Sequence, residues 1–158
     1  MVQMIFFPMT RNEAQSLRSG TAANDYVGCG ATPSLAAAVD ADSAIEEVEY
    51  AALSNAGVLA LVLKPNAPRL VVAAEVREEQ VKDRSEPHGE IEVRELAWAQ
   101  VRALFADEQD ALEAVTLAGK AVAGQSLAAA LITPEVAAVL DGYDLLWFAP
   151  EELDQLWP

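Results

Sequence analysis

The sequence predicts an α/β fold: one domain over residues 1–158, with a mixed sheet of five or six strands and helices packed on it. Three observations support this prediction. Short β-rich apolar runs alternate with segments of helical periodicity, hydrophobic residues make up 53% of the chain, and no shift in composition marks a linker. The expected fold includes an N-terminal β-α-β unit and a central antiparallel hairpin.

The N-terminal part predicts two strands with a helix between them. An apolar run over residues 2–7 indicates the first strand. Thr10 and Glu13 have the spacing of a capping box, so a short helix is expected over residues 11–19. A glycine-rich strand follows over residues 25–30. We expect the two strands to be parallel, as in a β-α-β unit.

Two helices are expected next. Thr32 is a hydroxyl N-cap followed by a proline, which predicts a brief helix over residues 34–39. Ser43 and Glu46 form another capping box, and apolar residues then recur at helical spacing as far as Lys64. This segment is the longest predicted helix, and the prolines that follow it prevent its continuation.

The middle of the chain predicts the antiparallel hairpin. Residues 70–76 are apolar throughout, as in a buried strand, whereas residues 90–96 alternate as in a half-exposed one. We expect these two strands to pair, joined by a long polar connection over residues 78–89. Residues 101–106 are ambiguous between strand and helix, and a strand is favoured.

The C-terminal third is expected to be mainly helical. Residues 107–123 form one predicted helix, and residues 127–141 form a second helical region. Residues 145–149 indicate a strand, with Trp147 in the core. A terminal helical turn over residues 150–156 is expected to dock on the domain, because its leucines need a surface to cover.

The charge of the chain excludes several classes of partner. The formal net charge is −15, from twenty-five acidic and ten basic residues. Without a basic cluster, we expect no direct binding to nucleic acid or to a membrane. No signal peptide is recognisable, and no apolar stretch reaches the roughly 20 residues of a membrane span. The single cysteine, Cys29, excludes an internal disulfide and fits a cytoplasmic location.

The segment from Gly28 to Thr32 is a candidate ligand site. It lies between a predicted strand and a helix start, where backbone amides can hold an anion. The dinucleotide fingerprint fails, because Pro33 stands where its third glycine is required. Two interpretations stay open. The glycines serve close strand packing and Thr32 caps a helix, or Gly28, Gly30 and Thr32 bind an anion or small molecule.

No catalytic residue, metal site or cofactor is predicted. Cys29 as a nucleophile would need His88 as its base, and His88 lies in a polar loop that cannot hold a base in place. We therefore expect Cys29 to be a small core residue. Glu46 and Glu49 share a predicted helix, but that helix lacks the histidines of a carboxylate-bridged metal site.

The acidic residues are concentrated in the C-terminal third. From Ala103 to the end, ten acidic residues are opposed by Lys120 alone. An exposed terminal tryptophan beside carboxylates would suit a protein partner with a basic surface. The candidate partner-binding residues are therefore Glu151, Glu152, Asp154 and Trp157.

Six short segments carry a resemblance to a known family: residues 5–8, 31–33, 47–52, 71–76, 146–148 and 152–153. In this order they resemble one family of small acidic actinobacterial proteins classed as a domain of unknown function. The resemblance implies one domain and brings no activity and no site residues.

Three functions follow from these observations. The first is a non-enzymatic acidic module for protein interaction or regulation. The second is a small-molecule or anion-binding domain, or an unrecognised enzyme, that uses the Gly28 to Thr32 turn. The third is a nucleic-acid mimic whose carboxylates imitate phosphates. The sequence does not indicate an oligomeric state.

Overall fold

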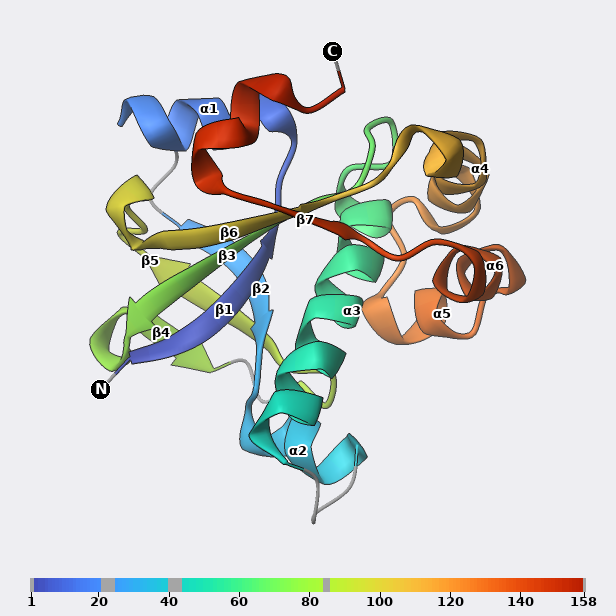
Figure 1. Cartoon of the computed structure of the whole chain (residues 1–158). Helices are drawn as coiled ribbons and strands as arrows, with labels where there is room; N and C mark the ends of the chain where they lie inside the picture. The colour runs from blue at the N-terminus through green and yellow to red at the C-terminus, as the bar shows by residue number, and fades with distance from the viewer. Residues whose placement is uncertain (1, 21–24, 40–43, 84–85, 158) are drawn as a thin grey trace.

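The computed structural model describes residues 2–20, 25–39, 44–83 and 86–157. A twisted sheet forms one side of the molecule, α3 crosses it, and α4–α6 lie beyond α3 (Figure 1). The strands are β1 (Val2–Pro8), β2 (Asp25–Gly30), β3 (Leu70–Arg77), β4 (Val81–Asp83), β5 (Glu90–Arg94), β6 (Val101–Ala106) and β7 (Leu146–Phe148). The helices are α1 (Arg11–Ser19), α2 (Pro33–Val39), α3 (Ile45–Leu63), α4 (Leu112–Val122), α5 (Leu127–Leu131) and α6 (Pro134–Gly142). Short 3₁₀ turns are η1 (Glu78–Gln80), η2 (Trp98–Gln100), η3 (Gln109–Ala111) and η4 (Pro150–Gln155).

The mixed α/β class is confirmed, but the expected sheet is not. The described strands form one seven-stranded sheet in the order β4-β5-β2-β1-β3-β6-β7, and every neighbouring pair is antiparallel. The prediction of a mixed sheet of five or six strands was therefore wrong. β4 was missed because its three residues lie in a polar connection, where no alternation of apolar residues marks a strand.

The N-terminal β-α-β unit was also wrong in its strand direction. β1 and β2 are adjacent and antiparallel, with Ile5 opposite Gly30 and Phe6 opposite Cys29. α1 begins at the predicted capping box, in which Thr10 and Glu13 bond to each other's backbone amides. The helix buries Ala14 and Leu17. Because β1 and β2 are antiparallel neighbours, α1 connects these two strands and is not the crossover of a parallel pair.

The predicted pairing of residues 70–76 with residues 90–96 was wrong. β3 pairs with β1 and β6, whereas β5 pairs with β2 and β4. A hairpin does exist in the middle of the chain, but β4 and β5 form it. β3 is buried along most of its length, and such a strand belongs between two neighbours at the centre of a sheet. The strand assignment of residues 101–106 is confirmed by β6.

Among the other helices, α2 and α3 agree with the sequence. The helix predicted over residues 107–123 starts only at Leu112, after the turn η3, and the helical region predicted over residues 127–141 is divided into α5 and α6. α3 spans nineteen residues and is the longest helix described. Thr32 caps α2, since its Oγ1 accepts a hydrogen bond of 3.1 Å from the Leu35 amide. The capping box predicted from Ser43 lies outside the described residues, and Ala44 is the N-cap of α3 without a side-chain bond. No described helix is long and apolar enough to cross a membrane.

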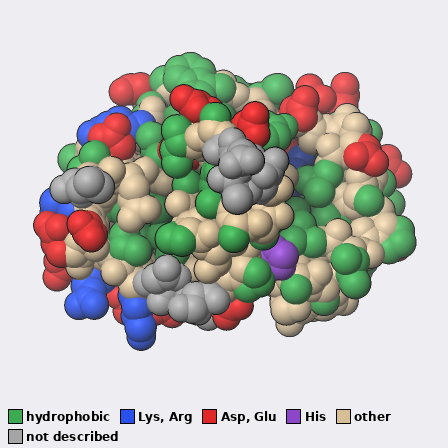
Figure 2. Space-filling view, turned by 90° about the horizontal axis from the view of Figure 1, so that it is seen from below, with side chains coloured by type: hydrophobic (Ala, Val, Ile, Leu, Met, Phe, Trp, Pro, Cys, Tyr) green, Lys and Arg blue, Asp and Glu red, His purple; other side chains and the backbone are tan. Residues whose placement is uncertain are grey.

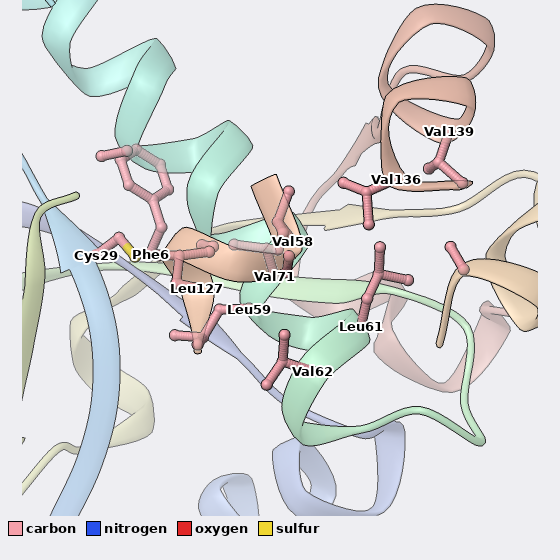
Figure 3. Packing of buried hydrophobic residues seen from close by; sticks show 14 of the residues in the cluster. Phe6, Cys29, Val58, Leu59, Leu61, Val62, Val71, Leu127, Val136 and Val139 are labelled. Atoms are coloured by element: carbon pink, nitrogen blue, oxygen red, sulfur yellow. The ribbon is translucent and has the colours of Figure 1, made fainter. Parts of the chain in front are cut away.

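Two hydrophobic clusters lie on the two faces of the sheet. One packs α3 against the sheet and extends to α4–α6, and Figure 3 shows Phe6 and Cys29 together within it, with Leu127, Val136 and Val139 contributed by the outer helices. The other lies under α1 and the C-terminal turn η4. Leu153 and Leu156 are buried there, which confirms the predicted docking of the tail.

Trp147 differs from its prediction as a core residue, since 61% of it is exposed. It lies on β7, the last strand of the sheet order, opposite Phe105 of β6. An apolar sequence run predicts a strand but not its position in the sheet, and at an edge a strand has a neighbour on one side only. Phe6 and Phe105 make an edge-to-face contact on this side, and Trp147 continues the same face outward.

A cavity with a buried arginine

The most distinctive polar group of the interior is the ion pair of Arg69 and Asp107. Arg69 directly precedes β3 and Asp107 directly follows β6, so the antiparallel pairing of these strands brings the two residues together. Each is only 2% exposed. Arg69 Nη2 and Asp107 Oδ1 are 2.7 Å apart, and Arg69 Nε donates to the same carboxylate. The backbone amide of Arg69 also donates to Asp107 Oδ2 at 2.7 Å.

One nitrogen of the Arg69 guanidinium, Nη1, has no hydrogen-bond acceptor among the described residues. Nε and Nη2 donate to Asp107, and Nη2 also donates to the carbonyl oxygen of Tyr143 at 3.3 Å. Nη1 makes no hydrogen bond within the described residues. A guanidinium has five N–H donors and no acceptor, so the two donors on Nη1 can only be satisfied by water or by an acceptor of a ligand.

Nη1 belongs to a residue that lines a cavity of about 220 Å³. The cavity lies between α3 and the segment that joins α6 to β7. Figure 2 shows that the surface is hollowed between the central and right-hand parts of the molecule. Its walls combine apolar and hydroxyl-bearing side chains: Tyr50, Leu53, Ser54, Leu140, Tyr143, Asp144 and Leu145, together with Arg69. Tyr50 and Asp144 are exposed at its rim.

Local structure explains how the walls are held. On α3, Leu53 and Ser54 lie about one helical turn after Tyr50, so the three side chains share a face. Gly57 follows one turn later, and a Cβ there would lie 3.4 Å from Leu145 and 3.6 Å from Arg69 Nη1. Both distances are ordinary van der Waals contacts, so the Arg69 guanidinium lies directly against α3 at this position.

The predicted glycine turn is explained by packing and capping. A Cβ on Gly28 would lie 2.7 Å from the Phe6 carbonyl oxygen, and one on Gly30 would lie 2.5 Å from Ile5 Cδ1. The Gly30 amide donates to the Gly89 carbonyl and the Thr32 amide to the Gly30 carbonyl, so neither faces a ligand. Thr32 is the cap of α2. The structure does not bring Gly28, Gly30 and Thr32 to the arginine cavity.

A second hollow lies beside this turn but has a different character. It has a volume of about 360 Å³, and its lining includes Ala31, Ile45, Glu49 and Glu75. Its charged groups are acidic, and Glu75 lies 3.7 Å from the Arg102 guanidinium. No buried donor converges on it among the residues that line it, so it lacks the polar group that would orient a ligand.

The predicted partner-binding residues have intramolecular partners, Glu151 excepted. Asp154 accepts two hydrogen bonds of 3.0 Å from Arg18, and these bonds, with one from Gln15, hold the pKa of Asp154 below its usual value. Glu152 accepts a bond from the Ala149 amide. Trp157 is half-buried, and its Nε1 donates to the Asp107 carbonyl at 2.8 Å. Glu151 is exposed and makes no ion pair within the described part of the chain.

The thiol of Cys29 lies in the core on β2. It is completely buried, and this burial, with the nearby charge of Glu90, raises its pKa to about 12. A thiol with this pKa is protonated at neutral pH and is a poor nucleophile. His88 uses its backbone carbonyl to accept a bond from Asn55. Among the described residues, no group of three or more His, Cys, Asp or Glu side chains is placed to hold a metal ion.

Sequence reasoning missed Arg69 and Asp107. The signal that could have found them is positional: a basic residue directly before one buried strand and an acidic residue directly after another. The two become neighbours only if those strands pair antiparallel, and the predicted pairing of β3 with β5 separated them.

Comparison with known proteins gives a family and no activity. No curated protein and no solved structure matches this chain. The model of one protein family, described as a family of unknown function (DUF6912), matches residues 4–157. That range includes every strand and helix except the first two residues of β1, and both members of the buried ion pair. The expected membership in a family of unknown function is thus confirmed, and the chain belongs to the DUF6912 family.

Proposed function

We propose that this protein is a binding domain whose cavity between α3 and α6 takes a carboxylate group. The observation that carries the proposal is the Arg69 side chain, which is 97% buried, with Nη1 unbonded among the described residues and the cavity beside it. No described side-chain nitrogen or oxygen is both buried and without a hydrogen bond, so Nη1 is open to the cavity, where water or a ligand can accept its protons. A carboxylate there would gain a charge-assisted hydrogen bond.

The surroundings favour a single carboxylate over a more highly charged anion. Asp107 already balances the charge of Arg69, Asp144 lies at the rim, and the whole chain carries −15. These charges disfavour a phosphate dianion. A carboxylate can still accept a charge-assisted hydrogen bond from Nη1, and the Ser54 hydroxyl on the same wall supplies a second donor.

The size of the cavity limits the ligand. Pockets for drug-sized molecules have volumes of about 300–1,000 Å³, whereas this one has about 220 Å³. The cavity therefore fits a small acid, or the carboxylate end of a larger molecule. The apolar walls from Leu53, Leu140 and Leu145 suit a short aliphatic body behind the carboxylate.

The test is a titration of the ¹⁵N-labelled protein followed by NMR. Propionate at millimolar concentration should shift the amide signals of Ser54 and of residues 143–145. Propionamide, of the same shape without the charge, and inorganic phosphate should shift them much less.

Two variants make the result specific. Ser54→Phe places a ring in the cavity and should abolish the propionate shifts. Thr116→Phe places the same ring on the exposed side of α4, away from the cavity, and should leave them unchanged. Propionate shifts that survive in Ser54→Phe, or no shifts in the parent protein, would overturn the proposal.

A further inference from the structure

We propose that the carboxylate is the C-terminus of a partner protein, whose extended tail adds to the sheet as a strand beside β7. This inference rests on the proposed function of the Arg69 cavity. Three observations support it: a free sheet edge, an exposed tryptophan on that edge, and the continuity of the edge with the cavity.

The edge is available. β7 is the last strand in the sheet order, and within the described residues it pairs with β6 alone. The backbone groups on its outer side make no hydrogen bond to any described residue. A strand edge of this kind is a template for an added peptide, with main-chain hydrogen bonds supplying affinity.

The same strand exposes two large apolar side chains. Trp147 is 61% exposed and Leu146 is 41% exposed. Short length protects an edge strand against unwanted pairing, but a tryptophan exposed there adds apolar surface that nothing in the described chain covers. Tryptophan is among the residues most often found at the energetic centre of an interface. Tyr50, exposed at the rim of the cavity, adds a second aromatic surface.

Strand direction selects the C-terminus of the peptide. Residues 143–145 line the cavity and lead directly into β7, which starts at Leu146. A peptide antiparallel to β7, as every strand pair in this sheet is, would run from the level of Phe148 towards the cavity. Its C-terminal end would therefore point towards residues 143–145, which line the cavity. Arg69 Nη1 is a donor, so it suits a carboxylate and not an N-terminal ammonium.

Charge selects the composition of the tail. Asp144 precedes the strand and Glu151 follows it; both are exposed, and neither makes an ion pair in the described chain. With a net charge of −15, the protein repels an acidic tail. Basic residues upstream of the terminal carboxylate would be attracted, chiefly through faster association at low salt. A tail with lysine or arginine before an apolar C-terminus satisfies both requirements.

The experiment uses the intact protein as the target and selects binders from a library of random octapeptides that are displayed with free C-termini. The enriched sequence is then synthesised as a free acid and as a C-terminal amide, and their affinities are compared. The free acid should bind at least ten-fold more tightly. Equal affinities for the two forms, or no enrichment from the library, would overturn the inference.

Variants separate the strand from the cavity. Trp147→Ala should weaken the peptide at least ten-fold while leaving the propionate shifts in place, and Leu117→Ala, at another exposed apolar position, should change neither. Unchanged peptide affinity in Trp147→Ala would exclude β7 as the docking edge. If propionate binds and no tail does, the cavity function stands and the partner tail fails. If neither binds, both proposals fail.

Discussion

Two polar pairs of this protein, Gln80 with Gln100 and Arg69 with Asp107, differ in the completeness of their hydrogen bonding. Gln80 and Gln100 bond to each other, and their remaining groups bond to the backbone of residues 75, 77, 94, 95 and 97. Arg69 and Asp107 are each 2% exposed, yet Nη1 of the arginine makes no bond within the described residues. The glutamine pair, whose hydrogen bonds are complete, has a structural role. The arginine of the ion pair keeps a free donor beside a cavity, and this donor is available to a ligand.

The largest expected effect comes from breaking the ion pair. Asp107→Ala leaves the Arg69 cation buried without its counter-charge, so we expect the free energy of unfolding to fall by about 3–5 kcal/mol. The double variant Arg69→Met with Asp107→Leu replaces both charges by apolar groups and should regain most of the loss. Urea unfolding measures both. A loss below 1 kcal/mol in Asp107→Ala would show that the pair is hydrated and not part of the core.

The saturated pair should affect stability alone. Gln80→Ala removes the part-buried hydrogen bonds from the Arg77 amide and to the Arg94 carbonyl, and at roughly 0.5–1.5 kcal/mol for each bond we expect a loss of about 1–3 kcal/mol. The propionate shifts at Ser54 should persist in this variant. Loss of those shifts in a folded Gln80→Ala protein would remove the contrast between the two pairs.

We expect substitutions in the segment from Gly28 to Thr32 to lower stability through steric conflict in the packing of the strands. Gly28→Ala should lower the free energy of unfolding by about 2 kcal/mol, because its Cβ would meet the backbone oxygen of Phe6 at 2.7 Å. Gly30→Ala should cost less, since the obstacle is the flexible end of Ile5. Gly142→Ala, with open space around it, is the control. Thermal unfolding ranks the three, and an equal cost at Gly28 and Gly142 would contradict the packing explanation.

The smallest effect concerns the C-terminal turn. Hydrogen bonds from Arg18 and Gln15 hold the pKa of Asp154 below 3.8, its usual value. A carboxyl group whose pKa is lower in the folded state stabilises the fold above its unfolded pKa, and this contribution disappears as the pH falls through the folded pKa. Carboxyl ¹³C NMR should report the low pKa, and Arg18→Ala should return it towards 3.8. An unchanged Asp154 titration in that variant would contradict the role of the pair.

The sequence predicted local structure better than strand partners. Capping at Thr10 and Thr32 and the helix of nineteen residues depend on neighbouring residues and were predicted correctly. The pairing of β3 depends on residues far apart in the chain, and the apolar run that marks a strand does not name its neighbour. Trp147 was misplaced for the same reason, because the run cannot distinguish an edge from the centre.

The candidate site could not be predicted without knowing which strands pair. Arg69 and Asp107 lie 38 positions apart, and only the pairing of β3 with β6 makes them partners. The charges of the acidic C-terminal residues are visible in the sequence, whereas the hydrogen bonds that their carboxylates make are not. In the structure, Asp154 and Trp157 bond within the chain, while an arginine with no charge pattern around it keeps a free donor.

The most direct test of the account is the NMR signal of the Arg69 Nη1 protons, in protein labelled with ¹⁵N in its arginine side chains. A buried, bonded guanidinium gives resolved side-chain signals, and assignment uses their disappearance in Arg69→Met with Asp107→Leu. We expect propionate to move the Nη1 proton signals downfield, because a new hydrogen bond forms there, while the signal of Nε, which is bonded to Asp107, changes little. Nη1 signals that remain in place at saturating propionate would contradict the central claim.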